Sequence, residues 1–329
     1  MRQRPVRFFN QSILFLFTAL IFNHAVWAAD DLSPRQWLER MMDAVQQLSY
    51  QGTFIYLHDN QLETMRIVHA VENDRVRESL MSLNGTPREV IRDEDSVTCV
   101  IPESKEVSVD RRPPSDKFLN LLPEDLELLD DHYTFQLLGR SRIANHQAQI
   151  VTIIPKDNLR YGYRFFLDTE TALPLKSDLM NEIGEVVEQT MFTDLQVGIA
   201  EINDIYRRKS IFTYQLKNHA DAVDTMDGGH VSRWDFQRLP SGFKMSLKHH
   251  LPDPENLLEP IEQYVFTDGL GSLSVFVESG GRGEALTGVS RLGAINAWGG
   301  QVEGHQVTAV GEVPAVTLLG IVQGMQLKP

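Results

Sequence analysis

The sequence predicts a mainly β protein of the α+β class. We expect a large, curled antiparallel sheet with helices in its concave side, and a smaller antiparallel-sheet domain that ends in a helix. Apolar and polar side chains alternate with a period of two over residues 49–200, lose this pattern over 201–228 and regain it afterwards. A chain of this length also exceeds what one hydrophobic core usually organises, so two domains are expected.

The N-terminus has the order of a secretory signal peptide. The first seven residues hold three arginines and no acid, residues 13–22 are apolar, and Val26 and Ala28 are the small residues before a cut after Ala28. The alternative is a retained membrane anchor, but the apolar run is shorter than the ~20 residues that span a bilayer. We therefore predict that residues 1–28 are removed and that the protein is exported to the periplasm.

The mature chain is strongly acidic. Removing three arginines changes the formal charge from 31 − 45 = −14 to 28 − 45 = −17. Such a surface repels phosphates, so no nucleic-acid partner is expected. Residues 29–200 hold 17 basic and 30 acidic side chains, whereas residues 201–329 hold 11 and 15. The second part is therefore the expected docking region for an acidic partner.

Cys99 is the single cysteine, which excludes an intrachain disulfide. In the segment SVTCVI, Cys99 shares one face of a predicted strand with Val97 and Ile101. This placement predicts a buried, inert thiol rather than a nucleophile.

The mature chain begins with a predicted helix. Ser33 is the expected N-cap, Pro34 occupies the first helical position and Gln36 completes a capping box. Apolar residues follow at helical spacing from Trp37 to Leu48, which predicts a helix that packs on a sheet.

Short strands follow this helix within a predicted domain of residues 29–205. They are separated by turn sequences such as HDNQ and ENDR. A flat open sheet of this many strands is disfavoured, so the sheet is expected to curl.

Residues 110–133 interrupt the strand pattern, because they are too rich in proline for one helix and too apolar for an ordinary loop. One interpretation is a pair of short helices that fill the concave side of the sheet and bury their leucines, including Leu128. The other is a movable lid over an apolar cavity.

A polar linker is predicted over residues 206–228, followed by a smaller domain over 229–329. Its first hairpin is predicted from residues 232–250, with Pro240 and Gly242 in the turn, and its second turns at Asp268 and Gly269. A strand and a terminal helix that begins at Pro314 complete this domain.

The chain shows no catalytic pattern. The segments G-x-S-x-G, H-x-x-x-H and H-E-x-x-H do not occur, and the adjacent His249 and His250 would point to opposite faces of a strand. We therefore predict that the protein is not an enzyme and uses no metal or cofactor.

Three long segments resemble one family. Residues 50–103 (YQGTFIYLHDNQ…SVTCVIPE), 161–180 (YGYRFFLDTETALPLKSDLM) and 304–325 (GHQVTAVGEVPAVTLLGIVQGM) are similar to the RseB/MucB family of periplasmic negative regulators of the sigma-E type envelope-stress sigma factor. The resemblance implies a large domain like the lipoprotein carriers LolA and LolB, which is a half-open β-barrel around an apolar cavity.

The resemblance also implies a mechanism. The protein would bind the periplasmic domain of a RseA/MucA-type anti-sigma factor, shield it from regulated proteolysis, and be released by lipopolysaccharide or another acyl-chain ligand. A homo-oligomer is left open. The alternative function is a periplasmic lipid or lipoprotein carrier of the LolA/LolB type, which has no need of a second domain.

Two groups of residues are candidates for these interactions. An acyl chain would contact apolar side chains of the sheet and of the 110–133 segment, and its phosphates would meet basic residues beside that segment. The anti-sigma factor would meet arginine and aromatic side chains of the linker and small domain, since these supply most interface hot spots. For Trp234 and Phe243 the alternative is a place in the hairpin core. The predicted lipid-binding residues are Phe54, Ile67, Phe118, Leu121, Leu122, Ile150, Phe165, Arg111, Arg112 and Lys117, and the predicted partner-binding residues are Arg207, Arg208, Trp234, Arg238, Phe243 and Arg282.

Overall fold

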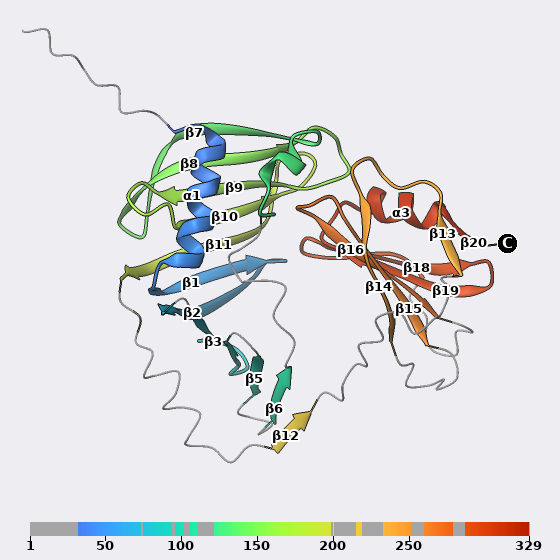
Figure 1. Ribbon diagram of the computed structural model, residues 1–329, viewed down its shortest axis with the longest axis horizontal. Helices are drawn as coiled ribbons and strands as arrows, with labels where there is room; N and C mark the ends of the chain where they lie inside the picture. Colours follow the sequence, from blue (N-terminus) through green and yellow to red (C-terminus); the bar gives the residue numbers. More distant parts are fainter. Residues whose placement is uncertain are drawn as a thin grey trace, which may run out of the picture. The chain divides into compact units, whose positions relative to one another are not determined.

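A computed structural model gives the fold of the chain, and residues 32–329 form one compact unit in it (Figure 1). The predicted signal peptide and most of the predicted linker lie outside the described residues. Within the part that is described, no helix is long and apolar enough to cross a membrane. The structure describes residues 32–73, 75–93, 96–101, 106–110, 122–198, 200, 215–218, 233–251, 260–278 and 287–328.

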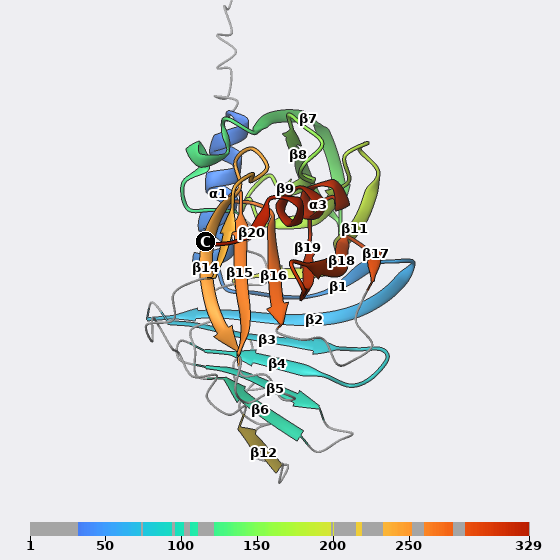
Figure 2. The same ribbon diagram turned by 90° about the vertical axis from the view of Figure 1, so that its right-hand side faces the viewer.

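The larger sheet has twelve strands, and Figure 2 shows β1 to β6 and β12 one above another. Their order is β12–β6–β5–β4–β3–β2–β1–β11–β10–β9–β8–β7, so the sheet does not close into a barrel within the described chain. All neighbouring strands are antiparallel except β12 and β6. The strands are β1 (Tyr50–His58), β2 (Gln61–Glu72), β3 (Arg75–Ser82), β4 (Glu89–Arg92), β5 (Val97–Ile101), β6 (Glu106–Asp110), β7 (Tyr133–Ile143), β8 (His146–Pro155), β9 (Gly162–Asp168), β10 (Pro174–Met180), β11 (Val186–Val197) and β12 (Gln215–Asn218).

Helix α1 (Pro34–Gln47) crosses one face of this sheet, as Figure 1 shows. The predicted capping box is confirmed: the Ser33 hydroxyl accepts a hydrogen bond from the Gln36 amide, and the Gln36 side chain accepts one from the Ser33 amide. Trp37, Leu38 and Met41 are buried against the strands. The apolar stripe read from the sequence is therefore the face that packs on the sheet.

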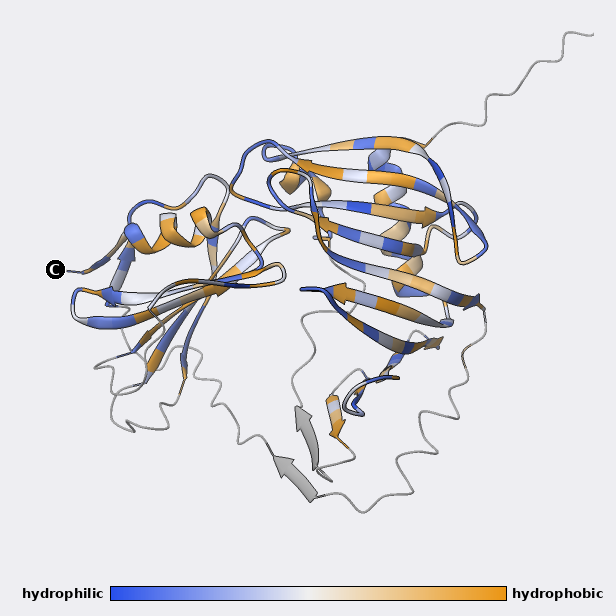
Figure 3. Ribbon diagram, turned by 180° about the vertical axis from the view of Figure 1, so that it is seen from behind, coloured by the Kyte–Doolittle hydropathy of each residue, from blue (hydrophilic) through white to orange (hydrophobic). Residues whose placement is uncertain are grey.

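Burial alternates along β15 (Ile261–Thr267) and β16 (Ser272–Glu278), as predicted, whereas β9 and β10 are buried at most positions. Figure 3 shows how apolar and polar residues are distributed over the two sheets. The β1–β2 turn is also where the sequence placed it. Asp59 and Asn60 have φ values of 44° and 58°, and this left-handed backbone suits a two-residue hairpin whose twist matches its strands.

The C-terminal part is a second sheet with a helix. Six antiparallel strands lie in the order β14–β15–β16–β19–β18–β17, and a separate pair joins β13 to β20. Helix α3 begins after Pro314, as predicted, and buries Leu318 and Ile321 in this part's own core. The elements are β13 (Trp234–Phe236), β14 (Lys244–Leu251), β15 (Ile261–Thr267), β16 (Ser272–Glu278), β17 (Gly288–Leu292), β18 (Ile295–Val302), β19 (His305–Gly311), α3 (Ala315–Gln323) and β20 (Met325–Leu327).

The hairpin predicted over residues 232–250 is wrong. The turn itself is present, because the Phe243 amide donates to the Pro240 carbonyl over 3.0 Å and Gly242 has a φ of 83°. However, β13 pairs with the C-terminal β20, and β14 pairs with β15. Alternation marks a strand but does not identify its partner, and here the partner is the last strand of the chain.

Two smaller expectations are also corrected. Cys99 is half-buried, and it is the neighbouring Thr98 whose side chain is buried. In the 110–133 segment, the 3₁₀ helix Leu126–Leu129 buries its first and last leucines but leaves Leu128 60% exposed. In a 3₁₀ turn, residues three apart such as Leu126 and Leu129 share a face, so the intervening Leu128 points away from the core.

Candidate functional site

The predicted lipid-contacting residues of the sheet lie in a packed core beneath α1. Phe54, Ile67 and Phe165 are almost completely buried, and Ile150 packs against the same core from a half-buried position. Leu122 belongs to this core as well. The structure therefore places all five described members of the predicted lipid-binding set in one packed core.

The other predicted lipid contacts lie outside the described residues. These are Phe118, Leu121, Arg111, Arg112 and Lys117. Whether residues 110–133 form a lid therefore stays a prediction. What the structure shows is that the end of this segment contributes Leu122, Leu126 and Leu129 to the core under α1.

A row of polar side chains continues from this core across strands β1 to β4. The Tyr50 and His69 rings stack with centroids 4.7 Å apart, and His69 Nδ1 lies 3.4 Å from a Glu78 carboxylate oxygen. Arg92 extends the row at 3.9 Å from Glu78. Tyr50, His69 and Glu78 are all buried, and burial followed by the charge of Glu78 raises the pKa of Tyr50.

Two atoms of this polar row have unused hydrogen-bonding capacity. The Tyr50 hydroxyl and His69 Nε2 have no hydrogen-bond partner among the described residues. Buried polar atoms normally have partners, so this row is where the polar part of a ligand or an ordered water would be best received. The sequence placed His69 on one strand face with Ile67, but strand alternation alone did not show its pairing with Tyr50.

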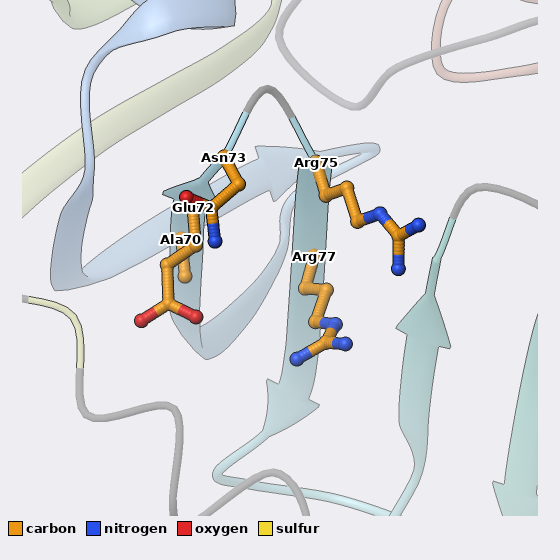
Figure 4. Close-up of a pocket in the computed structure, with 5 residues that line it drawn as sticks. All are labelled: Ala70, Glu72, Asn73, Arg75 and Arg77. Atoms are coloured by element: carbon orange, nitrogen blue, oxygen red, sulfur yellow. The ribbon is translucent and has the colours of Figure 1, made fainter.

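An open pocket of about 400 Å³ lies on the opposite face of the same strands, at the β2–β3 hairpin (Figure 4). Arg75 and Arg77 line it from β3, and Glu72 and Asn73 line it from the end of β2 and the turn. Glu72 is directly opposite Arg75 in the strand register. The pocket therefore presents both charges. The predicted ENDR turn already placed Glu72 near Arg75, but strand alternation gave no reason to expect a hollow there.

The predicted partner-binding residues are divided by the structure. Trp234 is 1% exposed and Phe243 is 4% exposed, and both pack in the C-terminal core. Arg238 is exposed. Arg207, Arg208 and Arg282 lie outside the described residues. Partner contact stays a prediction for this set, and Arg238 is the described member with a side chain available for it.

The most tightly built polar site lies where the loop before β9 meets the C-terminal part. The Arg160 guanidinium donates to Asp268 over 2.6 Å, and both side chains are 0% exposed. Arg160 also donates to Asp157 over 2.9 Å and to the Ser241 carbonyl. Asp268 accepts a second hydrogen bond from the Tyr133 hydroxyl over 2.8 Å.

Aromatic rings and close backbone contacts complete this site. The Arg160 guanidinium carbon lies 5.5 Å from the Tyr133 ring centre and 5.4 Å from that of Phe243. Gly242 has a φ of 83°, which favours glycine, and a side-chain Cβ there would be 2.4 Å from His132 Nε2. We call this set the junction, and it joins the twelve-stranded sheet to the C-terminal part through buried, directional contacts.

Comparison with known proteins gives a family for both parts of the chain. Residues 33–213 match the MucB/RseB N-terminal domain, and residues 229–326 match the MucB/RseB C-terminal domain. The sequence is 33% identical over 312 residues to the sigma factor AlgU regulatory protein MucB of Pseudomonas aeruginosa, covering 93% of this chain and 94% of the relative. It is 27% identical over 292 residues to the sigma-E factor regulatory protein RseB of Escherichia coli K12, covering 88% of this chain and 89% of the relative.

Solved structures give the same result. MucB crystallised in complex with the periplasmic part of MucA matches 90% of this chain and 100% of that chain, with 28% identity and a TM-score of 0.70. A second crystal structure of MucB matches 90% of this chain and 98% of that chain, with 31% identity and a TM-score of 0.58. The similarity thus extends over both sheets.

Proposed function

Since the chain belongs to the MucB/RseB family, we propose that it regulates a sigma-E type stress response by binding the periplasmic domain of a MucA/RseA-type anti-sigma factor. Binding would shield that domain from regulated proteolysis, so the protein would restrain the response without catalysis. The periplasm follows as its location. The observation that carries this proposal is the similarity of both parts of the chain to MucB solved with MucA.

An acyl-chain signal is the second half of the proposal. Support for it comes from the apolar side chains of the core beneath α1, which would have to move apart to admit a chain, and from the Tyr50–His69 row beside them for a polar group. Each methylene group removed from water contributes about 0.8 kcal/mol, so ~8 carbons would supply ~6 kcal/mol before ordering costs. A carrier of the LolA/LolB type is the alternative function, and it would bind lipid without binding the anti-sigma domain.

Titration of the anti-sigma periplasmic domain into the purified mature chain separates these functions. We expect a stoichiometric complex that slows cleavage of the anti-sigma domain by its first protease. A chain that binds lipid A but shows no complex by calorimetry would instead act as a carrier. Binding of neither would remove both functions.

Lipid A fragment is expected to displace the anti-sigma domain from the preformed complex. Thermodynamic linkage requires that lipid and partner weaken each other's binding by the same factor. We expect Leu121→Asp to weaken lipid binding at least ~10-fold, because a charge replaces an apolar contact. Leu128→Asp is the matched control, since Leu128 is 60% exposed in the same segment. Equal lipid affinity in both variants, each shown to be folded by circular dichroism, would contradict the proposed lipid contact.

A further inference from the structure

A second polar cluster also lies between the twelve-stranded sheet and the C-terminal part. It is built around two carboxylates. Glu188 lies on β11, and Glu312 follows β19. The Tyr163 hydroxyl is 3.5 Å from Glu312 Oε2, and the Ala294 amide donates to Glu188 Oε1 over 3.2 Å. Both contacts cross from the twelve-stranded sheet to the C-terminal part. The Tyr56 hydroxyl donates to the other oxygen of Glu188 over 2.7 Å.

The surroundings of Glu312 are mostly acidic or phenolic. The negative charge of Glu188 repels the charged form of Glu312, and the Tyr163 hydroxyl donates a hydrogen bond to Glu312. Among the described residues no cation forms a salt bridge with Glu312, so its negative charge is not neutralised by a direct partner. The titratable and charged groups that face this cluster are Tyr56, Glu63, Tyr161, Tyr163, Glu182, Glu188, Asp268 and Arg291.

These surroundings disfavour the charged form of Glu312. Burial, followed by the charge of Glu188, raises the pKa of Glu312 from 4.5 to about 7, against a smaller lowering by the Tyr163 hydrogen bond. If the two parts separate, Glu312 returns to water and its pKa returns to the ordinary value. Between these two pH values the joined form therefore holds a proton that the separated form has lost.

We propose that the junction between the twelve-stranded sheet and the C-terminal part is proton-controlled, so that ionisation of Glu312 beside Glu188 loosens it. The joined form binds the proton more tightly. Its extra stability is therefore fully present below pH 4.5 and is lost as the pH rises through about 7. Each part has a hydrophobic core built mainly from its own residues, although Ala294 and Leu270 of the C-terminal part also pack in the core of the twelve-stranded part. We therefore expect each part to stay folded while the contact between them changes.

The size of the effect follows from the two pKa values. Complete exposure of Glu312 on separation would lower the joining equilibrium constant roughly 70-fold between pH 5 and pH 8. Glu312 is only half-buried, and solvent screening reduces the interaction, so we expect about a 10-fold change. The inference goes beyond the proposed function, because it concerns the chain alone, without the anti-sigma factor or lipid.

Spin labels on the two parts can measure this equilibrium in the whole mature chain. Gln136 on β7 and Gln301 on β18 are exposed, so both can be replaced by cysteine in a Cys99→Ser background. Double electron–electron resonance at pH 5, 6, 7 and 8 then gives the fraction of chains in which the two parts have separated. We expect the ratio of separated to joined chains to rise about 10-fold from pH 5 to pH 8.

Three variants test the assignment. Glu312→Gln keeps a neutral side chain at every pH, so it should remain joined at pH 8 and lose the pH response. Glu188→Gln removes the repulsion, so the midpoint should move to lower pH. Glu303→Gln is the matched control, because Glu303 is an exposed acid in the β18–β19 turn and glutamine keeps an acceptor for the Leu327 amide, so it should behave as the parent does.

The proposal has clear failures. Identical distance distributions at pH 5 and pH 8 in the parent chain would overturn it. A Glu312→Gln chain that keeps the parent's pH response would assign the response to another group. If that variant does not fold, an unchanged midpoint in Glu188→Gln would have the same meaning. None of these outcomes depends on whether the protein binds an anti-sigma factor.

Discussion

Replacing Arg160 by alanine is expected to lower the free energy of unfolding by about 3–5 kcal/mol, because it leaves the buried Asp268 carboxylate without its cation. The variant also loses the hydrogen bonds to Asp157 and the Ser241 carbonyl, and the packing of the guanidinium between two rings. Urea-induced unfolding followed by circular dichroism measures the change. Arg88→Ala is the control, because its 3.8 Å ion pair with Glu63 is half exposed and contributes at most ~1 kcal/mol.

A double-mutant cycle separates the ion pair from general packing loss. In Asp268→Asn the negative charge is removed. The one remaining side-chain oxygen can accept either from the Tyr133 hydroxyl or from the Leu270 and Gly271 amides. The combined Arg160→Ala/Asp268→Asn variant should then cost less than the sum of the single changes, since no uncompensated buried charge remains. Additive single effects would mean that Arg160 and Asp268 do not depend on each other.

Replacing Trp234 by alanine is expected to destabilise the C-terminal part by about 3–5 kcal/mol, because a fully buried aromatic side chain leaves a cavity. Binding of the anti-sigma domain should weaken with it, as a consequence of partial unfolding. Arg238→Ala should leave stability nearly unchanged. Its side chain is exposed, so the free energy of unfolding should stay within ~0.5 kcal/mol of the parent value. If Arg238 contacts the partner, affinity should fall about 10-fold or more.

The two measurements together decide the role of each residue. Stability comes from urea unfolding and affinity from calorimetry with the anti-sigma periplasmic domain. A Trp234→Ala chain with parental stability but weak partner binding would contradict its assignment to the core. An Arg238→Ala chain with parental affinity would remove Arg238 from the predicted partner surface.

Local features of the fold were predictable because they depend on neighbours in sequence. Ser33, Pro34 and Gln36 specify the start of α1 through their own hydrogen bonds. Asp59 and Asn60 specify the first hairpin, since they adopt the required left-handed backbone. The open, curled sheet followed from the number of alternating segments and from the family resemblance.

Pairing over long separations was not predictable in the same way. The partner of β13 is β20, at the other end of the C-terminal part. The alternating sequence of β13 would be equally compatible with pairing to the next strand along the chain. The same limit applies to the sites. Arg160 and Asp268 are 108 positions apart, and each looks like an ordinary surface residue in sequence, in a loop before one strand and in a hairpin turn.

Residue type alone does not distinguish surface from core, for a physical reason. Aromatic side chains are enriched both at interface hot spots and in protein interiors. Phe243 satisfies both descriptions, and only its 4% exposure shows that it packs inward. A charged residue such as Arg238 carries less ambiguity, because burial of an unpaired charge is costly.

The parallel pairing of β12 with β6 sets the length of the tether between the two parts. Asn218 ends β12 and Trp234 begins β13, so 234 − 218 = 16 peptide steps separate them, with a maximum reach of about 55 Å. Because the two parts belong to one chain, their association is intramolecular. An opened junction can therefore close again within one molecule at a rate independent of protein concentration. Cutting the chain between these two strands would turn closure into a bimolecular reaction that dilution reverses.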